Sequence, residues 1–255
     1  SLSYNKTFIN YWLLGLLVLL LFMILIGGLT RLTDSGLSIT NWQPVIGSIP
    51  PLTKTDWILV FEQYKLTNEF KFQNFQMSLN DFKIIYWWEW GHRQFGRLIG
   101  VFWFLGFIYL LVATYLPRFL KISFLTLGFL GLIQAFIGWW MVKSGLDNET
   151  NLLDVASYRL AIHLNIALII TSFIFVLLKI NYSWSHNDSL PFSFDQFSFE
   201  KFKISLFILF LFFQITLGAL VSGIDAGNSY NEWPQMDGKF VPEDYFSLEP
   251  NYINF

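Results

Sequence analysis

Long uninterrupted apolar runs dominate the hydrophobic pattern of this chain. Each approaches the roughly 20 apolar residues that a transmembrane helix requires. The runs predict five membrane-spanning helices, at about residues 12–29, 91–115, 122–142, 156–178 and 204–223. The fold class that we predict is an all-α polytopic membrane protein.

The polar stretch between the first two runs, residues 30–83, is long for a connection and is expected to be functional. Three aromatic residues recur in it at helical spacing: Trp57, Phe61 and Tyr64. They predict a short amphipathic helix that either lies on the membrane surface or packs within the loop. Ser78 and Asp81 form a capping-box pattern, which predicts an interfacial lead-in helix before the second span.

Basic residues mark one side of the membrane. Short loops rich in Lys and Arg stay on the cytoplasmic side. The basic positions are Lys6, Arg118, Lys121, Lys179, Lys201 and Lys203. They place the N-terminus inside the cell, with the long first loop, the acidic loop around residues 147–154 and the acidic tail outside.

The amino-acid composition limits the kinds of binding and catalytic site that the chain can form. The 255 residues are 54% hydrophobic and only 13% charged, against roughly 25% charged in soluble domains. The net charge is -2, so the chain lacks the excess of basic residues that nucleic-acid binding requires. The chain has no cysteine, which excludes disulfides, thiolate nucleophiles and iron–sulfur clusters. A metal must therefore be held by His, carboxylate or Met.

The chain contains an internal repeat at an offset of 191 residues. Seven positions recur without a gap: Gly27, Leu29, Asp34, Gly36, Trp42, Gly47 and Pro51 return as Gly218, Leu220, Asp225, Gly227, Trp233, Gly238 and Pro242. We therefore expect two repeated four-helix bundles, of which the second is truncated. This divides the chain into a first half at 1–180, a cytoplasmic connection at 181–203 and the start of the second repeat at 204–255.

Glu89 and His92 lie where the second apolar run begins. An ionisable side chain at membrane depth costs on the order of 2.5–3.5 kcal/mol, so it marks a functional site by default. The two residues share a helix face that Gly96 and Gly100 continue. Such a face suits a porphyrin beside its axial histidine. The alternative for His92 is a hydrogen bond to a neighbouring helix.

His163 lies inside the fourth apolar run, at a depth comparable to that of His92. Two histidines at similar depth on alternate spans are typical of a ligand pair, so we expect His92 and His163 to bind one metal. A single buried histidine would instead be a polar core residue. His186 lies in the polar inner connection, where a solvated side chain is expected.

Four arginines accompany these residues near the outer boundary: Arg31, Arg93, Arg97 and Arg159. They either extend to water and pair with acidic residues, or bind the propionate carboxylates of a haem. Glu89 has two roles open to it. It could act as a general base or stabilise a developing positive charge, or it could form an ion pair with Arg93 one turn away.

The motifs together resemble the haem A synthases of proteobacteria and mitochondria. Those that carry the resemblance are Gly27-Gly28-Leu29-Thr30-Arg31-Leu32-Thr33, Ser35-Gly36-Leu37-Ser38-Ile39, Trp42-x-Pro44, Pro50-Pro51-Leu52, Glu89-x-x-His92-Arg93, Gln134, Gly138, Met141-Val142-x-Ser144-Gly145-Leu146, Tyr158-Arg159-Leu160-Ala161-x-His163-Leu164 and Leu217-Gly218-Ala219. They extend over nearly the whole chain. No single one is specific, but the combination is.

The resemblance implies an eight-helix enzyme of the cell inner membrane, an oxidoreductase that oxidises the C8 methyl of haem O to the formyl group of haem A by hydroxylations with oxygen from water. His92 and His163 would lie near the substrate iron, and Glu89 would be catalytic. A second half would hold haem b through its own histidine pair. Haem O synthase and a terminal oxidase are candidate partners, and a homo-oligomer is expected.

The sequence departs from this family in two ways. It lacks the cysteine pair that some relatives carry in the first outer loop. The offset also places the second histidine pair beyond residue 255, which predicts that the sequence is C-terminally incomplete. The closest alternative is a membrane cytochrome or haem chaperone without chemistry on the porphyrin. An inverted-repeat transporter disagrees with the parallel repeat, and a di-iron enzyme needs a second Glu-x-x-His motif.

Overall fold

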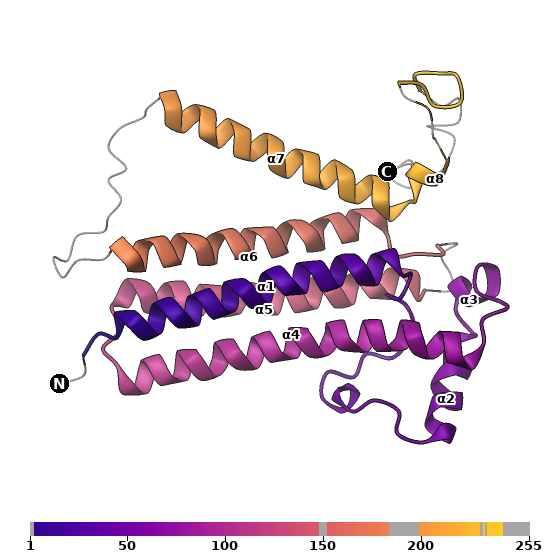
Figure 1. Ribbon diagram of the computed structural model, residues 1–255, viewed down its shortest axis with the longest axis horizontal. Coiled ribbons are helices and arrows are strands. Elements are labelled where there is room, and N and C mark those ends of the chain that lie inside the picture. The colour runs from indigo at the N-terminus through magenta and orange to yellow at the C-terminus, as the bar shows by residue number, and fades with distance from the viewer. Residues whose placement is uncertain (1–2, 148–151, 184–198, 230–231, 233, 242–255) are drawn as a thin grey trace.

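A computed structural model (Figure 1) describes residues 3–147, 152–183, 199–229, 232 and 234–241. Its helices are α1 (Lys6–Leu32), η1 (Ile46–Ser48), α2 (Lys54–Tyr64), α3 (Asn68–Phe72), α4 (Leu79–Ala113), α5 (Arg118–Gly145), α6 (Ser157–Ser183), α7 (Phe199–Gly223) and α8 (Ala226–Ser229). Five of them, α1, α4, α5, α6 and α7, are long and apolar enough to cross a membrane. The all-α membrane fold is confirmed.

Helices α1, α4, α5 and α6 lie side by side as a bundle, and α7 runs along α6 outside it (Figure 1). Leu13, Leu110, Phe124 and Leu177, one from each bundle helix, are fully buried in one hydrophobic cluster. This core lies toward the end of the bundle that carries the N-terminus. The other end of the bundle, where the outer helices α2 and α3 lie, contains the candidate functional residues identified from the sequence.

Helix α4 contains both the predicted lead-in helix and the second span. It is one continuous helix, which begins at the expected capping box between Ser78 and Asp81. Continuity follows from packing, because Phe82, Ile85 and Tyr86 bury themselves against α2 and leave no break before Gly91. At 1.5 Å per residue α4 is about 52 Å long, so it projects well beyond a hydrocarbon core of about 30 Å.

Helix α2 is the amphipathic helix that the sequence predicts either on the membrane surface or within the loop, and its packing decides between the two. Trp57, Phe61 and Tyr64 are buried, and they pack on the first turns of α4. A capping box between Thr53 and Asp56 starts the helix. The aromatic face therefore belongs to a packed outer subdomain, and it is not available for a membrane surface.

Helices α1 and α7 end in matching turns. Asp34 and Asp225, which the repeat pairs, both have a positive φ, of 46° and 49°. The Asp34 N–H donates to Arg31 O at 3.2 Å, and the Asp225 N–H donates to Ser222 O at 3.3 Å. Other positions singled out in the sequence lie outside the described residues: Glu149, His186, Trp233 and Pro242.

Because α1 packs closely on α4, we expect position 106 of α4 to tolerate no residue larger than Gly106. A Cβ at Gly106 would lie 2.0 Å from Trp12 Nε1, whereas a Cβ at Gly100 on the same helix would meet no atom within 4 Å. We expect Gly106→Ala to destabilise the protein by about 1–3 kcal/mol, because overpacking forces the helices apart. Gly100→Ala should be neutral or slightly stabilising. Thermal unfolding followed by circular dichroism in detergent measures both, and equal melting temperatures would contradict the packing.

Candidate functional site

Glu89 is the most deeply buried acidic residue of the membrane helices, with 3% of its surface exposed. Its Oε2 accepts hydrogen bonds from Ser38 Oγ and from the Ile39 N–H, both at 2.7 Å. Its Oε1 accepts from Arg93 Nη2 one turn further along α4. The segment that follows α1 thus provides two of the three donors, and the charge of the carboxylate is compensated.

Arg93 extends this network to the backbone. Its Nη2 also donates to Ile39 O at 3.1 Å, and its Nη1 lies 3.5 Å from Asn41 O. A buried carboxylate persists only when its charge and lone pairs are satisfied. The expected ion pair is therefore confirmed. It fixes the carboxylate in one place, which suits electrostatic stabilisation of a nearby positive charge.

His92 of α4 and His163 of α6 both lie partly buried within the bundle. Each faces a glycine of another helix: a Cβ at Gly27 of α1 would lie 3.4 Å from His92 Nε2, and a Cβ at Gly138 of α5 would lie 2.9 Å from His163 Cε1. All four bundle helices therefore contribute to the surroundings of these two rings.

Gln134, one turn before Gly138 on α5, positions His163. Its Nε2 donates to His163 O at 3.0 Å and lies 3.4 Å from His163 Nε2. Gln134 Oε1 and His163 Nδ1 are buried without a hydrogen-bond partner among the described residues. These polar atoms without partners, together with the glycines packed against the two imidazoles, fit a haem-binding site. Over the same residues, no group of three His, Cys, Asp or Glu forms a conventional metal site.

The four arginines differ in what they contact. Arg31 pairs with Asp34 and Asp225, both at 2.8 Å, and more distantly with Asp154. Arg97 donates to the carbonyls of Gln43 and Pro44, yet its Nη1 is buried without a partner among the described residues.

Arg159 donates to Trp140 O at 2.7 Å, and its guanidinium lies 4.3 Å from the centroid of the Trp140 ring. Arg31 thus holds the end of α7 against the first bundle. Arg31 Nε and Arg97 Nη1 are both buried without a hydrogen-bond partner among the described residues. Arg31 already binds carboxylates, whereas Arg97 binds backbone carbonyls, so Arg97 is the better placed to receive a carboxylate.

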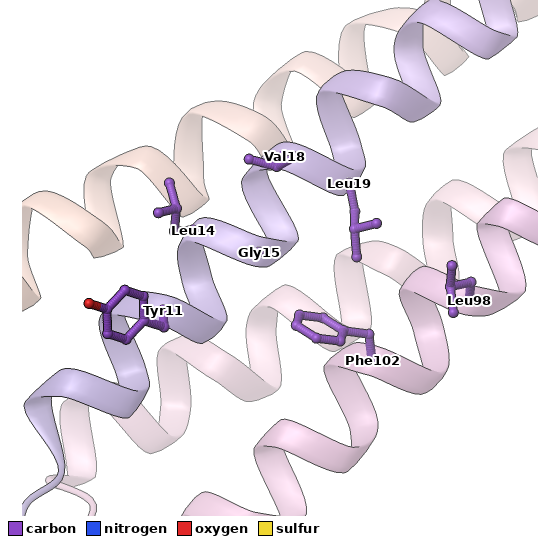
Figure 2. A pocket seen from close by; sticks show the side chains of 7 residues that line it. All are labelled: Tyr11, Leu14, Gly15, Val18, Leu19, Leu98 and Phe102. Atoms are coloured by element: carbon purple, nitrogen blue, oxygen red, sulfur yellow. The ribbon is translucent and has the colours of Figure 1, made fainter.

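An apolar groove lies outside this site. Figure 2 shows its lining on α1 and α4: Tyr11, Leu14, Gly15, Val18, Leu19, Leu98 and Phe102. None of these side chains is one of the candidate residues. The groove begins almost two turns beyond His92 along α4 and runs toward the N-terminal end of α1. Its chemistry is that of a lipid-facing surface.

Sequence reasoning missed several residues of this site. Ser38 and Ile39 bind Glu89, Gln134 binds His163, and Gly27 and Gly138 make space for the two rings. All five belong to the motifs that carry the family resemblance. Their contacts join distant parts of the chain, so no spacing within the sequence could assign them a role.

Glu69 on α3 is a second buried carboxyl in the outer subdomain, with 2% of its surface exposed. Burial, and to a smaller extent the negative charges of Asp154, Glu89 and Asp34, raise its pKa to about 9, against a hydrogen bond with Tyr64 that lowers it. Its Oε2 has no hydrogen-bond partner among the described residues. Glu69 is therefore protonated at neutral pH, unlike an ordinary carboxyl.

Comparisons with known proteins bear on the whole chain. The COX15-CtaA family model, described as cytochrome oxidase assembly protein, matches residues 10–255. A protein named heme A synthase from Roseobacter denitrificans is 49% identical over 248 residues, which cover 97% of this chain and 64% of that protein.

Heme A synthases from Ruegeria sp. strain TM1040 and Cereibacter sphaeroides strain ATCC 17025 are 46% and 45% identical, over 97% and 92% of this chain and 65% and 60% of theirs. The chain thus spans less than two thirds of the length of these relatives. No solved structure matches it.

The raised pKa of Glu69 predicts a pH dependence of stability. Between the ordinary value of 4.5 and about 9, the folded protein holds a proton that the unfolded chain releases, so stability falls as pH rises through this window. At pH 7 the loss is on the order of 3 kcal/mol. Glu69→Gln should remove it, and the exposed Glu62→Gln should not. Melting temperatures measured from pH 5 to 9 test this, and parallel curves for all three proteins would contradict it.

Proposed function

We propose that this chain, which belongs to the COX15-CtaA family of cytochrome oxidase assembly proteins, acts as a haem A synthase. It would oxidise the C8 methyl of haem O to a formyl group by successive hydroxylations with oxygen from water. One observation carries the proposal: a buried, fully hydrogen-bonded carboxylate, Glu89, stands one turn from His92 on α4. The names of the relatives supply haem A as the product, and the oxidation of haem O is what the family resemblance implies.

Substrate binding would use His92 and His163 near the iron of haem O. Neutral imidazole is a standard haem ligand, and Gly27 and Gly138 leave space beside the two rings. Arg97 would bind a propionate through its free Nη1, and Arg93 and Arg159 lie near enough to the outer end to assist. Arg31 would serve the substrate indirectly, because its guanidinium already holds Asp34 and Asp225.

Glu89 would stabilise the positive charge that develops on the substrate during the reaction. Removal of electrons from the methyl group leaves positive charge on its carbon, and an oriented carboxylate in a dry site stabilises that charge strongly. Ser38, Ile39 and Arg93 hold the carboxylate before any substrate arrives, so no reorganisation is needed. No residue of this chain is assigned to the haem b of the proposal.

The membrane arrangement follows the same proposal. Residues 1–180 would form the substrate half, 181–203 the cytoplasmic connection and 204–255 the start of a second half, for which the matching turns at Asp34 and Asp225 give support. Lys6, Arg118 and Lys179 lie at one end of the bundle. The positive-inside rule assigns that end to the cytoplasm and the haem site to the outer side of the inner membrane.

A haem carrier or chaperone is the second candidate. It would use the same histidines without needing Glu89, so the presence of an expensive buried charge at this position favours the enzyme. Haem O synthase, a terminal oxidase and further copies of this chain are proposed partners, since substrate and product must pass through the membrane to them.

Glu89→Gln separates the two candidates. It keeps the size of the side chain but loses the negative charge, so we expect haem A formation to fall at least about 100-fold while haem still binds. The exposed Glu62→Gln is the control. Haems extracted from cells that carry each variant as the only copy are analysed by HPLC and mass spectrometry, with and without a supply of haem O. Normal haem A levels in Glu89→Gln would favour the carrier.

Gly138→Ala tests the histidine site. The added Cβ would meet the His163 ring at 2.9 Å, whereas Gly131→Ala, two turns earlier on α5, adds a methyl to open space. Displacing the imidazole should weaken haem binding about tenfold. Absorbance titration of the purified variants with haem measures the affinity. Equal affinities for the two variants would place the haem elsewhere.

A further inference from the structure

The segment of residues 42–52, which includes η1, takes an unusual path. Figure 1 shows the chain between α1 and α2 running back along α4 toward the middle of that helix before it returns to α2. Its side chains are apolar and exposed, at 79% for Val45, 72% for Ile46, 63% for Ile49 and 76% for Leu52. A water-facing loop would not normally carry such a cluster.

The depth of this segment follows from its partners on α4. Counted outward from the end of α4 at Ala113, a hydrocarbon core of about 30 Å takes up about 20 residues, to roughly position 93. Gln94 and Arg97 lie inside that limit, and both donate hydrogen bonds to the segment. The segment therefore lies beside the part of α4 that the outer lipid leaflet surrounds.

The backbone of the segment is adapted to a medium without water. The carbonyls of residues 43–48 all accept hydrogen bonds. Arg97 donates to Gln43 O and Pro44 O, and Gln94 donates to Gly47 O and Ser48 O, at 3.0–3.2 Å.

The η1 turn supplies donors to the remaining two carbonyls, through Ser48 to Val45 O and through the Ile49 N–H to Ile46 O. Three prolines, Pro44, Pro50 and Pro51, carry no N–H to satisfy. Non-helical backbone at membrane depth is tolerated only when it is satisfied in this way by protein.

The segment also reaches the next helix of the bundle. Trp42 stacks on Trp139 of α5, with ring centroids 5.4 Å apart. Since Gln94 and Arg97 hold the same segment to α4, it bridges α4 and α5 on the outer half of the bundle. Gly138, which faces His163, directly precedes Trp139.

We propose that residues 42–52 form a re-entrant segment whose apolar side chains insert among the acyl chains of the outer leaflet, with Arg97 and Gln94 satisfying its backbone. Lipid is the occupant that the geometry favours, because the exposed side chains continue the lipid-facing surface of α4. The inference concerns the segment alone and does not depend on the haem chemistry.

The experiment uses the absence of cysteine from the chain. Ile46→Cys is labelled with a nitroxide in phosphatidylcholine vesicles, and its collisions with oxygen and with a water-soluble nickel chelate are compared by power-saturation EPR. Val101→Cys on α4 is the lipid reference, and Leu66→Cys, 64% exposed in the outer subdomain, is the matched control. We expect Ile46 to match Val101, with oxygen dominant, and Leu66 to favour the nickel chelate.

Arg97→Leu in the Ile46→Cys background tests the hydrogen bonds. Without their donor, the carbonyls of Gln43 and Pro44 should draw the segment toward water, and nickel accessibility at Ile46 should rise at least twofold while Leu66 stays unchanged. Nickel accessibility at Ile46 equal to that at Leu66 in the parent protein would overturn the proposal. Exclusion of both reagents would overturn it as well, because it would show that a second copy of the chain covers the segment.

Discussion

The structure depends on one interaction, the compensation of the buried negative charge of Glu89. Glu89 lies at the boundary of the hydrocarbon, where an unpaired carboxylate would be too costly to keep. Ser38, Ile39 and Arg93 supply its partners, and two of these come from the segment after α1. The interaction that makes the charge tolerable therefore also ties the long first loop to α4, which places the outer subdomain over the end of the bundle.

The histidine site follows from close helix approach. Gly27 and Gly138 let α1 and α5 come near the imidazoles of His92 and His163, and larger residues would fill the space that a planar ligand needs. Gln134 adds orientation, because its amide is held by the His163 carbonyl and lies beside the ring. The compensated charge of Glu89 and the imidazole of His92 thus lie one turn apart on the same helix.

Much of this could be predicted from local pattern. Apolar runs located the five spans, and Trp57, Phe61 and Tyr64 located α2, because hydrophobic periodicity reports a buried face directly. The pairing of His92 with His163 on one metal, expected from their similar depth, stays a prediction. The continuity of α4 through Tyr86 could not be predicted, since it depends on packing against α2. Nor could the contact of Arg31 with Asp225, which joins residues 194 apart, so its expected place beside a propionate rested on position only.

One constraint explains both the candidate site and the loop beside it. In a low-dielectric medium each polar group must find a partner within the protein. Glu89 finds three, and the carbonyls of the 42–52 segment find theirs in Gln94, Arg97 and the η1 turn. Arg93 and Gln94 are adjacent on α4 and Arg97 lies one turn beyond Arg93, so one stretch of this helix supplies donors both to the buried carboxylate of Glu89 and to the carbonyls of the 42–52 segment. The same few side chains therefore hold the loop after α1 against α4.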